Sequence, residues 1–307
     1  MRHEPLMINP QRSRPANSPQ IRLDRGVAAR SRVAVALGCL IACACAAENG
    51  QAGPLLPYVP AVGNGPACIP NLDGHIDASE LVAAMGIPAR FRVSPAELHV
   101  PVDLKGFVND KGQQVWDWSE RSSTDRLASF TATPVSGRWY AAHFAADAFT
   151  VGLDAGGRFD AVYRRDVQGL WLLGTASREE SPADGQSLLV YQQPVAVLRF
   201  PLEKGRSWTS KGKVSNGKLY GLPWIGEDTY EVSVDATGRL ELPDLTLTQT
   251  LRVRTKLTIT PAIGPTITEQ QVSFLFECLG EVARATSLRN ETKADFETAS
   301  ELRRLSL

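Results

Sequence analysis

Hydrophobic and polar residues alternate along residues 245–260, which is the clearest pattern in the chain. The odd-numbered positions are mostly Leu, Val and Ile, whereas the even-numbered positions are Thr, Arg and Lys. Successive side chains of a β-strand point to opposite faces, so this segment predicts a long strand with one buried and one solvated face. Strands of this kind belong to antiparallel sheets.

The segments on either side continue the pattern. Residues 261–265 predict a turn, and the return strand places Val272, Phe274, Phe276 and Cys278 on one face. Upstream, apolar and polar residues alternate again over 230–235. Residues 228–289 therefore predict a meander of long strands, which must coil or bend because of their length. Such a sheet can curl around an enclosed ligand.

The remaining pattern between 91 and 227 indicates shorter strands separated by Gly- and Asp-rich turns, with Pro101 at an edge position. Residues 77–86 predict a short helix that ends before Pro88, and residues 294–307 fit either a helix or a final strand. The expected fold class is mainly β: an antiparallel, curved sheet, sandwich or half-barrel of long strands with one or two short helices and a disordered N-terminus.

An apolar run of ten residues, Val33–Ala42, follows the basic residues Arg30 and Arg32. Its length suits the core of a signal peptide and is too short to span a bilayer. The run ends in Leu40-Ile41-Ala42-Cys43, which resembles the lipobox of bacterial lipoproteins. This resemblance implies cleavage before Cys43 and lipidation of its thiol. The alternative is a secretory peptide that is cut after residues 44–46.

The expected division of the chain follows from this N-terminus. Residues 1–42 are a signal peptide with an extended n-region, and residues 43–67 are a lipidated Cys followed by a flexible tether rich in Ala, Gly and Pro. Residues 68–90 hold a loop and a short helix, and residues 91–307 form the β-rich domain. By analogy with the sorting rule of enteric bacteria, Ala44 after the lipidated Cys favours the outer membrane.

Export also determines how the other cysteines are interpreted, because thiols outside the cytoplasm are usually paired. Cys45 adjoins the anchor, so Cys68 is expected to form a disulfide with Cys278. The alternative is that Cys278 is a small buried residue on a strand.

Residues 68–81, CIPNLDGHIDASEL, resemble the second half of an EF-hand or dockerin-type calcium loop. With Gly74 as the loop glycine, the implied calcium ligands are Asn71, Asp73, His75 through its carbonyl, Asp77 and Glu80. The sequence departs from the pattern at the first position, where Ile69 replaces Asp. The alternative is an Asx-turn followed by a helix that Asp77 and Glu80 cap.

The charge balance and the motifs of the chain narrow the classes of function that it can have. Residues 43–307 hold 26 of the 33 basic and 31 of the 33 acidic residues, a mildly acidic balance that argues against a nucleic-acid surface. No nucleotide-binding or hydrolase motif occurs, so the chain is not expected to be an enzyme. A hydrolase would need His99 or His143 beside a carboxylate and a hydroxyl. Arg252, Arg254 and Lys256 predict a basic stripe, which is either an anion site or a solvated outer face.

Taken together, the lipobox and the partial calcium loop resemble those of uncharacterised envelope lipoproteins of the myxobacterial type. The resemblance implies a lipid-anchored, non-enzymatic binding or structural module at the outer membrane, with an apolar ligand or an envelope protein as its partner. A calcium-dependent adhesion or assembly module, and a hydrolase with an unrecognised site, are the alternatives.

Overall fold

The computed structural model describes residues 68–81, 85–95 and 98–307. The description below concerns the unit of residues 64–307. The predicted signal peptide, the lipidated Cys43, the tether and the disordered N-terminus lie outside the described residues.

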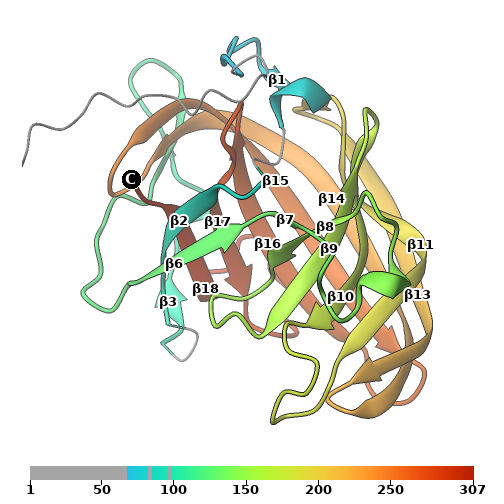
Figure 1. The fold of residues 1–307 in the computed structure, drawn as a ribbon. Coiled ribbons are helices and arrows are strands. Elements are labelled where there is room, and N and C mark those ends of the chain that lie inside the picture. The colour runs from blue at the N-terminus through green and yellow to red at the C-terminus, as the bar shows by residue number, and fades with distance from the viewer. Residues whose placement is uncertain (1–67, 82–84, 96–97) are drawn as a thin grey trace, which may run out of the picture. The chain divides into compact units, whose positions relative to one another are not determined.

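Antiparallel strands of residues 88–305 form one large sheet that curls into a nearly closed barrel (Figure 1). Its path runs β6-β2-β18-β17-β16-β15-β14-β13-β11-β10-β9-β8-β7. Only Ala132 separates β6 from β7, and β6 pairs with β2 while β7 pairs with β8. The two ends of the path therefore meet at one stretch of chain, which brings the sheet close to complete closure.

The strands on this path are β2 (Pro88–Val93), β6 (Arg126–Thr131), β7 (Thr133–Pro134), β8 (Phe149–Gly152), β9 (Phe159–Arg165), β10 (Gly169–Ser177), β11 (Leu188–Arg199), β13 (Ser207–Leu219), β14 (Leu222–Glu241), β15 (Thr246–Pro261), β16 (Ile267–Phe276), β17 (Gly280–Ser287) and β18 (Thr298–Leu305). The short strands β3 (Val100–Pro101), β4 (Phe107–Val108) and β5 (Gln114–Asp117) join it from the side. The remaining two, β1 (His75–Ile76) and β12 (Leu202–Glu203), pair with each other.

The predicted fold class is confirmed: the described chain is mainly β and antiparallel, with long curved strands. The strand predicted at 245–260 is β15, which pairs with β14 on one side and β16 on the other. At the C-terminus the strand alternative holds, because β18 is inserted between β17 and β2.

The helix predicted over 77–86 was wrong in extent. Within the described part of this range the helical residues are a 3₁₀ turn, η1 (Ala78–Glu80), and Leu81 leaves helical geometry at φ −116° and ψ 64°. A second 3₁₀ turn, η2 (Ala141–His143), lies between β7 and β8. Short 3₁₀ turns of this kind serve as connectors and do not pack as independent helices.

A large apolar cluster covers part of the outer face of the barrel. Trp116 and Trp118 pack on Phe274 of β16, with ring centroids 4.8 and 5.0 Å apart. Both indole N–H groups donate to backbone carbonyls in the segment before β4, at Leu104 and Asp103. The chain from β3 to β5 is thus fixed against the outside of the sheet, and the outer side of β16 is a buried core.

The predicted basic stripe lies on the outer face of β15 and is neutralised there. Arg252 and Arg254 both contact Asp235, at 2.8 and 2.5 Å, and Lys256 contacts Glu231 at 2.9 Å. Arg252 also lies over the ring of Trp116, 5.0 Å from its centroid. These contacts fit a paired outer face and leave no free cationic stripe.

Candidate functional site

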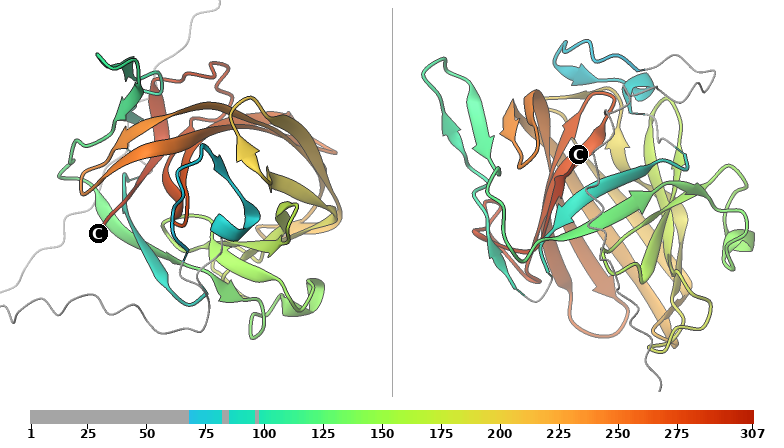
Figure 2. Two further views of the ribbon diagram at one scale, coloured as in Figure 1. Left: turned by 90° about the horizontal axis from the view of Figure 1, so that it is seen from above. Right: turned by 60° about the vertical axis from the view of Figure 1, so that its left-hand side comes forward.

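The plug segment, residues 68–81, lies across one end of the barrel. Seen from above in Figure 2, it falls within the outline of the ring of strands. β1 pairs with β12, and the side chain of Ile76, only 2% exposed, packs in a cluster with Val232, Val253 and Leu275 from the inner face. The plug segment thereby closes this end of the barrel with apolar contacts.

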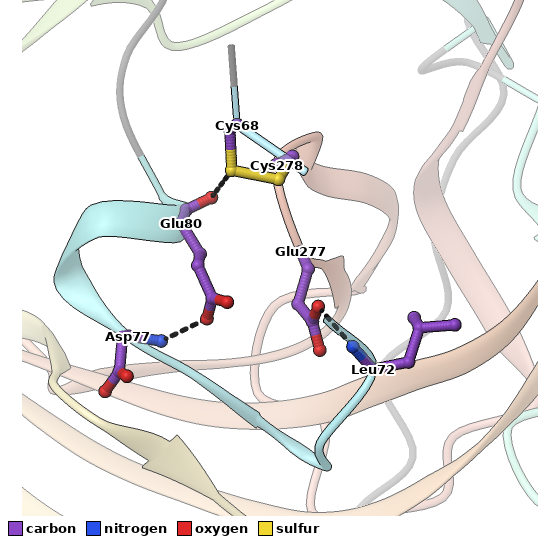
Figure 3. Close-up of a disulfide and its surroundings, with 6 residues drawn as sticks. All are labelled: Cys68, Leu72, Asp77, Glu80, Glu277 and Cys278. Atoms are coloured by element: carbon purple, nitrogen blue, oxygen red, sulfur yellow. Dashed lines mark hydrogen bonds between the residues drawn. A yellow bond between two sulfur atoms is a disulfide. The ribbon is translucent and has the colours of Figure 1, made fainter. Parts of the chain in front are cut away.

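Three bonds tie the plug segment to the residues that follow β16, and Figure 3 shows two of them, the disulfide and the hydrogen bond between Leu72 and Glu277. A disulfide joins Cys68 to Cys278, with an S–S distance of 2.01 Å. The Glu277 carboxylate accepts a hydrogen bond from the Leu72 N–H at 2.8 Å, and the Cys278 N–H donates to the Glu80 carbonyl at 2.9 Å. Glu277 and Cys278, in the turn between β16 and β17, therefore hold both ends of the plug segment.

Three of the side chains predicted as calcium ligands, those of Asn71, Asp73 and Glu80, are engaged in local hydrogen bonds. Asn71 Oδ1 accepts from the Asp73 N–H, Asp73 Oδ1 accepts from the His75 N–H, and Glu80 Oε2 accepts from the Asp77 N–H. Asp73 also lies 3.0 Å from the His75 ring. The arrangement has the Asx-turn and capping contacts of the alternative interpretation. Among the described residues no cluster of three or more acidic, His or Cys side chains could hold a metal, and calcium binding stays a prediction that calorimetry with calcium tests.

The inner face of the barrel changes from apolar to polar along the same strands. Near the plug segment, Val232 and Val234 of β14 are 2% and 1% exposed. The next inner positions on β14 are Tyr230 and Asp228, and those across β15 on β16 are Gln271 and Glu269. Tyr230, Gln271 and Glu269 keep partial contact with solvent. An interior packed with side chains alone would not leave these groups accessible, so water reaches the inner face beyond the apolar level.

We call the ionisable and phenolic side chains of this face the inner cluster; its members are Tyr163, Tyr191, Asp228, Tyr230, Glu269, Glu281, Arg284, Glu301 and Arg303. Ladder pairing aligns Arg284 with Arg303 on neighbouring strands, on the face that Ser273 and Val253 share. The positive charges of Arg284 and Arg303 act to lower the pKa of Tyr163 on β9, although β9 neighbours neither β17 nor β18 in the sheet. These groups therefore face one another across the interior.

Each arginine of the inner cluster has a carboxylate partner. Arg284 contacts Glu281 at 2.8 Å, and Glu281 also accepts a hydrogen bond from Ser273 at 2.9 Å. Arg303 contacts Glu301, donates to the Leu153 carbonyl at 2.6 Å and lies 4.3 Å from the centroid of the Phe130 ring. Both guanidinium groups are thus held in fixed positions on the inner wall.

Desolvation inside the barrel alters the acid–base properties of the cluster. It raises the pKa of Tyr163 and Tyr230, so both phenols stay protonated and can donate hydrogen bonds. It also raises the pKa of Glu269, an effect that the positive charges of Arg289 and Arg284 oppose. The interior therefore disfavours the charged form of groups that lack a close partner.

Asp228 carries an unpaired oxygen in this environment. Its Oδ2 accepts a hydrogen bond from the Tyr191 hydroxyl at 2.5 Å, and that hydroxyl lies 3.4 Å from the hydroxyl of Tyr230. Asp228 Oδ1 is buried and has no hydrogen-bond partner, and the whole residue is only 6% exposed. Desolvation raises the pKa of this carboxyl. A buried acceptor without a donor is rare in native proteins, so the position requires an explanation.

The histidines considered for a hydrolase lie elsewhere. His99 and His143 are exposed, and their side chains form no hydrogen bond or ion pair with any described residue. Neither belongs to the inner cluster. A groove of about 700 Å³ on the outer face, lined in part by Thr209, Glu231 and Lys256, contains the paired charges of the outer stripe.

Sequence reasoning missed the inner cluster because its members occupy polar positions in alternating strands, where a solvated surface is the simplest expectation. The available signal is the density of ionisable residues at such positions in β16 to β18. Comparisons with protein-family models, curated proteins and solved structures give no match. Among the described residues no helix is long and apolar enough to cross a membrane.

Proposed function

We propose that this protein is a lipid-anchored, non-enzymatic binding module of the bacterial envelope that holds an amphipathic ligand inside its barrel. The observation that carries the proposal is the inner face itself, which is apolar beside the plug segment and polar, charged and partly accessible beyond it. Ligand sites combine apolar walls with a few placed polar groups, and the mouth of a barrel is a common location for them.

The division of the inner face refines the predicted apolar ligand. Leu257 and Ile259 of β15 are partly exposed inner residues that offer apolar surface, just beyond the level that the plug segment covers. The inner cluster offers hydrogen-bond donors and charges further along the same strands. A molecule with a hydrocarbon part and a polar head group matches both zones, whereas a purely apolar molecule would leave the polar zone without partners.

The anchor rests on the lipobox and the tether. Leu40-Ile41-Ala42-Cys43 provides the acylation motif, and residues 44–67 provide reach between the membrane and the domain. A diacylated N-terminus attaches a protein stably to a membrane, because a single acyl chain gives only reversible membrane binding whereas two chains together keep the protein bound.

Expression of the full chain and its Cys43→Ser variant in a Gram-negative host tests both parts of the proposal. We expect the parent protein in the envelope fraction and the Cys43→Ser variant in the soluble fraction of the periplasm. Native mass spectrometry of the soluble variant should then show an additional mass that organic solvent removes. A variant that stays in salt-washed envelopes contradicts the anchor, and a bare protein mass after exposure to envelope lipid extract contradicts the binding function.

A further inference from the structure

We propose that Asp228, Tyr230 and Glu269 form a subsite for a cationic, primary ammonium head group of the amphipathic ligand. This inference rests on the proposed binding function and adds the chemical class of the head group. The three residues lie on the inner face of two strands, β14 and β16, that flank β15.

Strand pairing places the three residues near one another on the inner face. Tyr230 and Glu269 both pair with Leu257, one from each side, and Asp228 pairs with the next inner residue, Ile259. Neighbouring strands lie about 4.8 Å apart, so Tyr230 and Glu269 stand about 10 Å apart across Leu257. The negative charges of Asp228 and Glu269 both act to raise the pKa of Tyr230. A head group over Leu257 would therefore lie between the two acids.

One carboxylate oxygen of Asp228 has no hydrogen-bond donor. Asp228 occupies an inner position of β14, and its Oδ1 is buried and lacks a hydrogen-bond donor. The Tyr191 hydroxyl holds Oδ2 at 2.5 Å and so fixes the carboxylate in place before a ligand arrives. An ammonium N–H would satisfy Oδ1 and supply the positive charge that this buried carboxylate lacks. A charge-assisted hydrogen bond of this kind is stronger than one between neutral groups.

The carboxylates of the inner cluster differ in whether an arginine forms an ion pair with them. Glu281 and Glu301 each have an arginine partner. Within the part of the chain that the structure describes, neither Asp228 nor Glu269 forms an ion pair within 4 Å, although the positive charges of Arg289 and Arg284 act on Glu269 from further away. Asp228 is therefore the acid of the inner cluster that lacks a cationic partner.

An anionic head group is the competing outcome. Arg165 lies two residues along β9 from Tyr163, hence on the same face, and its buried Nε has no hydrogen-bond partner among the described residues. Arg284 and Arg303 are less suited to an anion because both already bind carboxylates. The sign of the preferred head group therefore decides between the Asp228 subsite and Arg165.

The test compares three ligands of equal chain length on the full-length Cys43→Ser chain: dodecylammonium and dodecanoate below their micellar concentrations, and dodecanol below its solubility limit. Isothermal titration calorimetry should show that dodecylammonium binds about tenfold or more tightly than the other two. Asp228→Asn, which keeps the shape and removes the charge, should abolish this advantage and leave the affinity for dodecanol within about threefold. Glu231→Gln, on the outer face of the same strand, is the matched control and should leave all three affinities unchanged.

Each outcome is decisive. Equal or tighter binding of dodecanoate overturns the cationic subsite while the binding function stands, and binding of none of the three ligands overturns both. Unchanged dodecylammonium affinity in Asp228→Asn overturns the subsite, with bound water as the partner of Oδ1. If Asp228→Asn does not fold, Glu269→Gln takes its place, with an expected loss of about threefold or more in dodecylammonium affinity.

Discussion

The double variant Cys68→Ser/Cys278→Ser is expected to lose about 2–4 kcal/mol of unfolding free energy. The disulfide joins residues 210 positions apart, so it closes most of the domain into one covalent loop and restricts the unfolded chain strongly. In the folded state the same bond holds the plug segment beside Glu277, whose carboxylate accepts the Leu72 N–H. Urea denaturation at equilibrium, followed by tryptophan fluorescence, measures the change.

The loss should also be local. Without the disulfide, the plug segment keeps its hydrogen bonds and the buried Ile76 but can open without global unfolding. Limited proteolysis should cleave near residue 68 faster than in the parent chain, while the barrel survives. Cys45→Ser is the matched control, because that residue precedes the domain. Unchanged stability and unchanged cleavage in the double variant would show that the bond does not hold the plug segment.

Asp125→Asn is expected to lower the unfolding free energy by about 3–5 kcal/mol, because it leaves a buried arginine without its counter-charge. Arg304 and Asp125 expose only 5% and 4% of their side chains, and their atoms lie 2.6 Å apart. The guanidinium of Arg304 also donates to the carbonyl oxygens of Trp118 and Glu120. This pair therefore anchors the chain before β6 to β18, where the two ends of the sheet approach.

An exposed ion pair provides the control for this variant. Glu231→Gln removes the partner of Lys256 on the outer face, where both side chains are about half exposed, so we expect a change of about 0–1 kcal/mol. Chemical denaturation of both variants under identical conditions gives the comparison. A similar small loss in Asp125→Asn would mean that water compensates Arg304 and that the pair is not a structural anchor.

Much of the fold follows from the alternation of side chains. The strand of residues 245–260 and its neighbours were predictable because the inner face of β15 is apolar. On that face Leu251 and Val253 pack in one cluster with Ile76 of the plug segment. The short helix was not, because its apolar spacing fits a helix while the hydrogen bonds of Asp77 and Glu80 support only one 3₁₀ turn.

The candidate site could not be predicted from the sequence because the apolar side chains of two paired strands, β15 and β16, face opposite sides of the sheet. On β15 the apolar side chains face inward, whereas on β16 Val272 and Phe274 face outward and Gln271 and Ser273 face inward. The cause is Trp116 and Trp118, which cover the outside of β16 from a distant part of the sequence. Alternation within a strand cannot reveal which face a remote segment covers, so polar inner residues look like a solvated surface.

Thiol labelling of Thr286→Cys measures most directly whether the barrel encloses a space that a ligand can occupy. Thr286 pairs with Gln271 on the inner face, and Thr209→Cys on the exposed outer face of β13 serves as the reference. Both are made in a chain whose Cys39, Cys43 and Cys45 are replaced by Ser, so that the introduced thiol is the one outside the disulfide. We expect a small maleimide to modify both thiols in the folded protein, and dodecylammonium to slow only the reaction at position 286. An inner thiol that reacts only on unfolding, or one that the ligand leaves unprotected, would contradict a binding site inside the barrel.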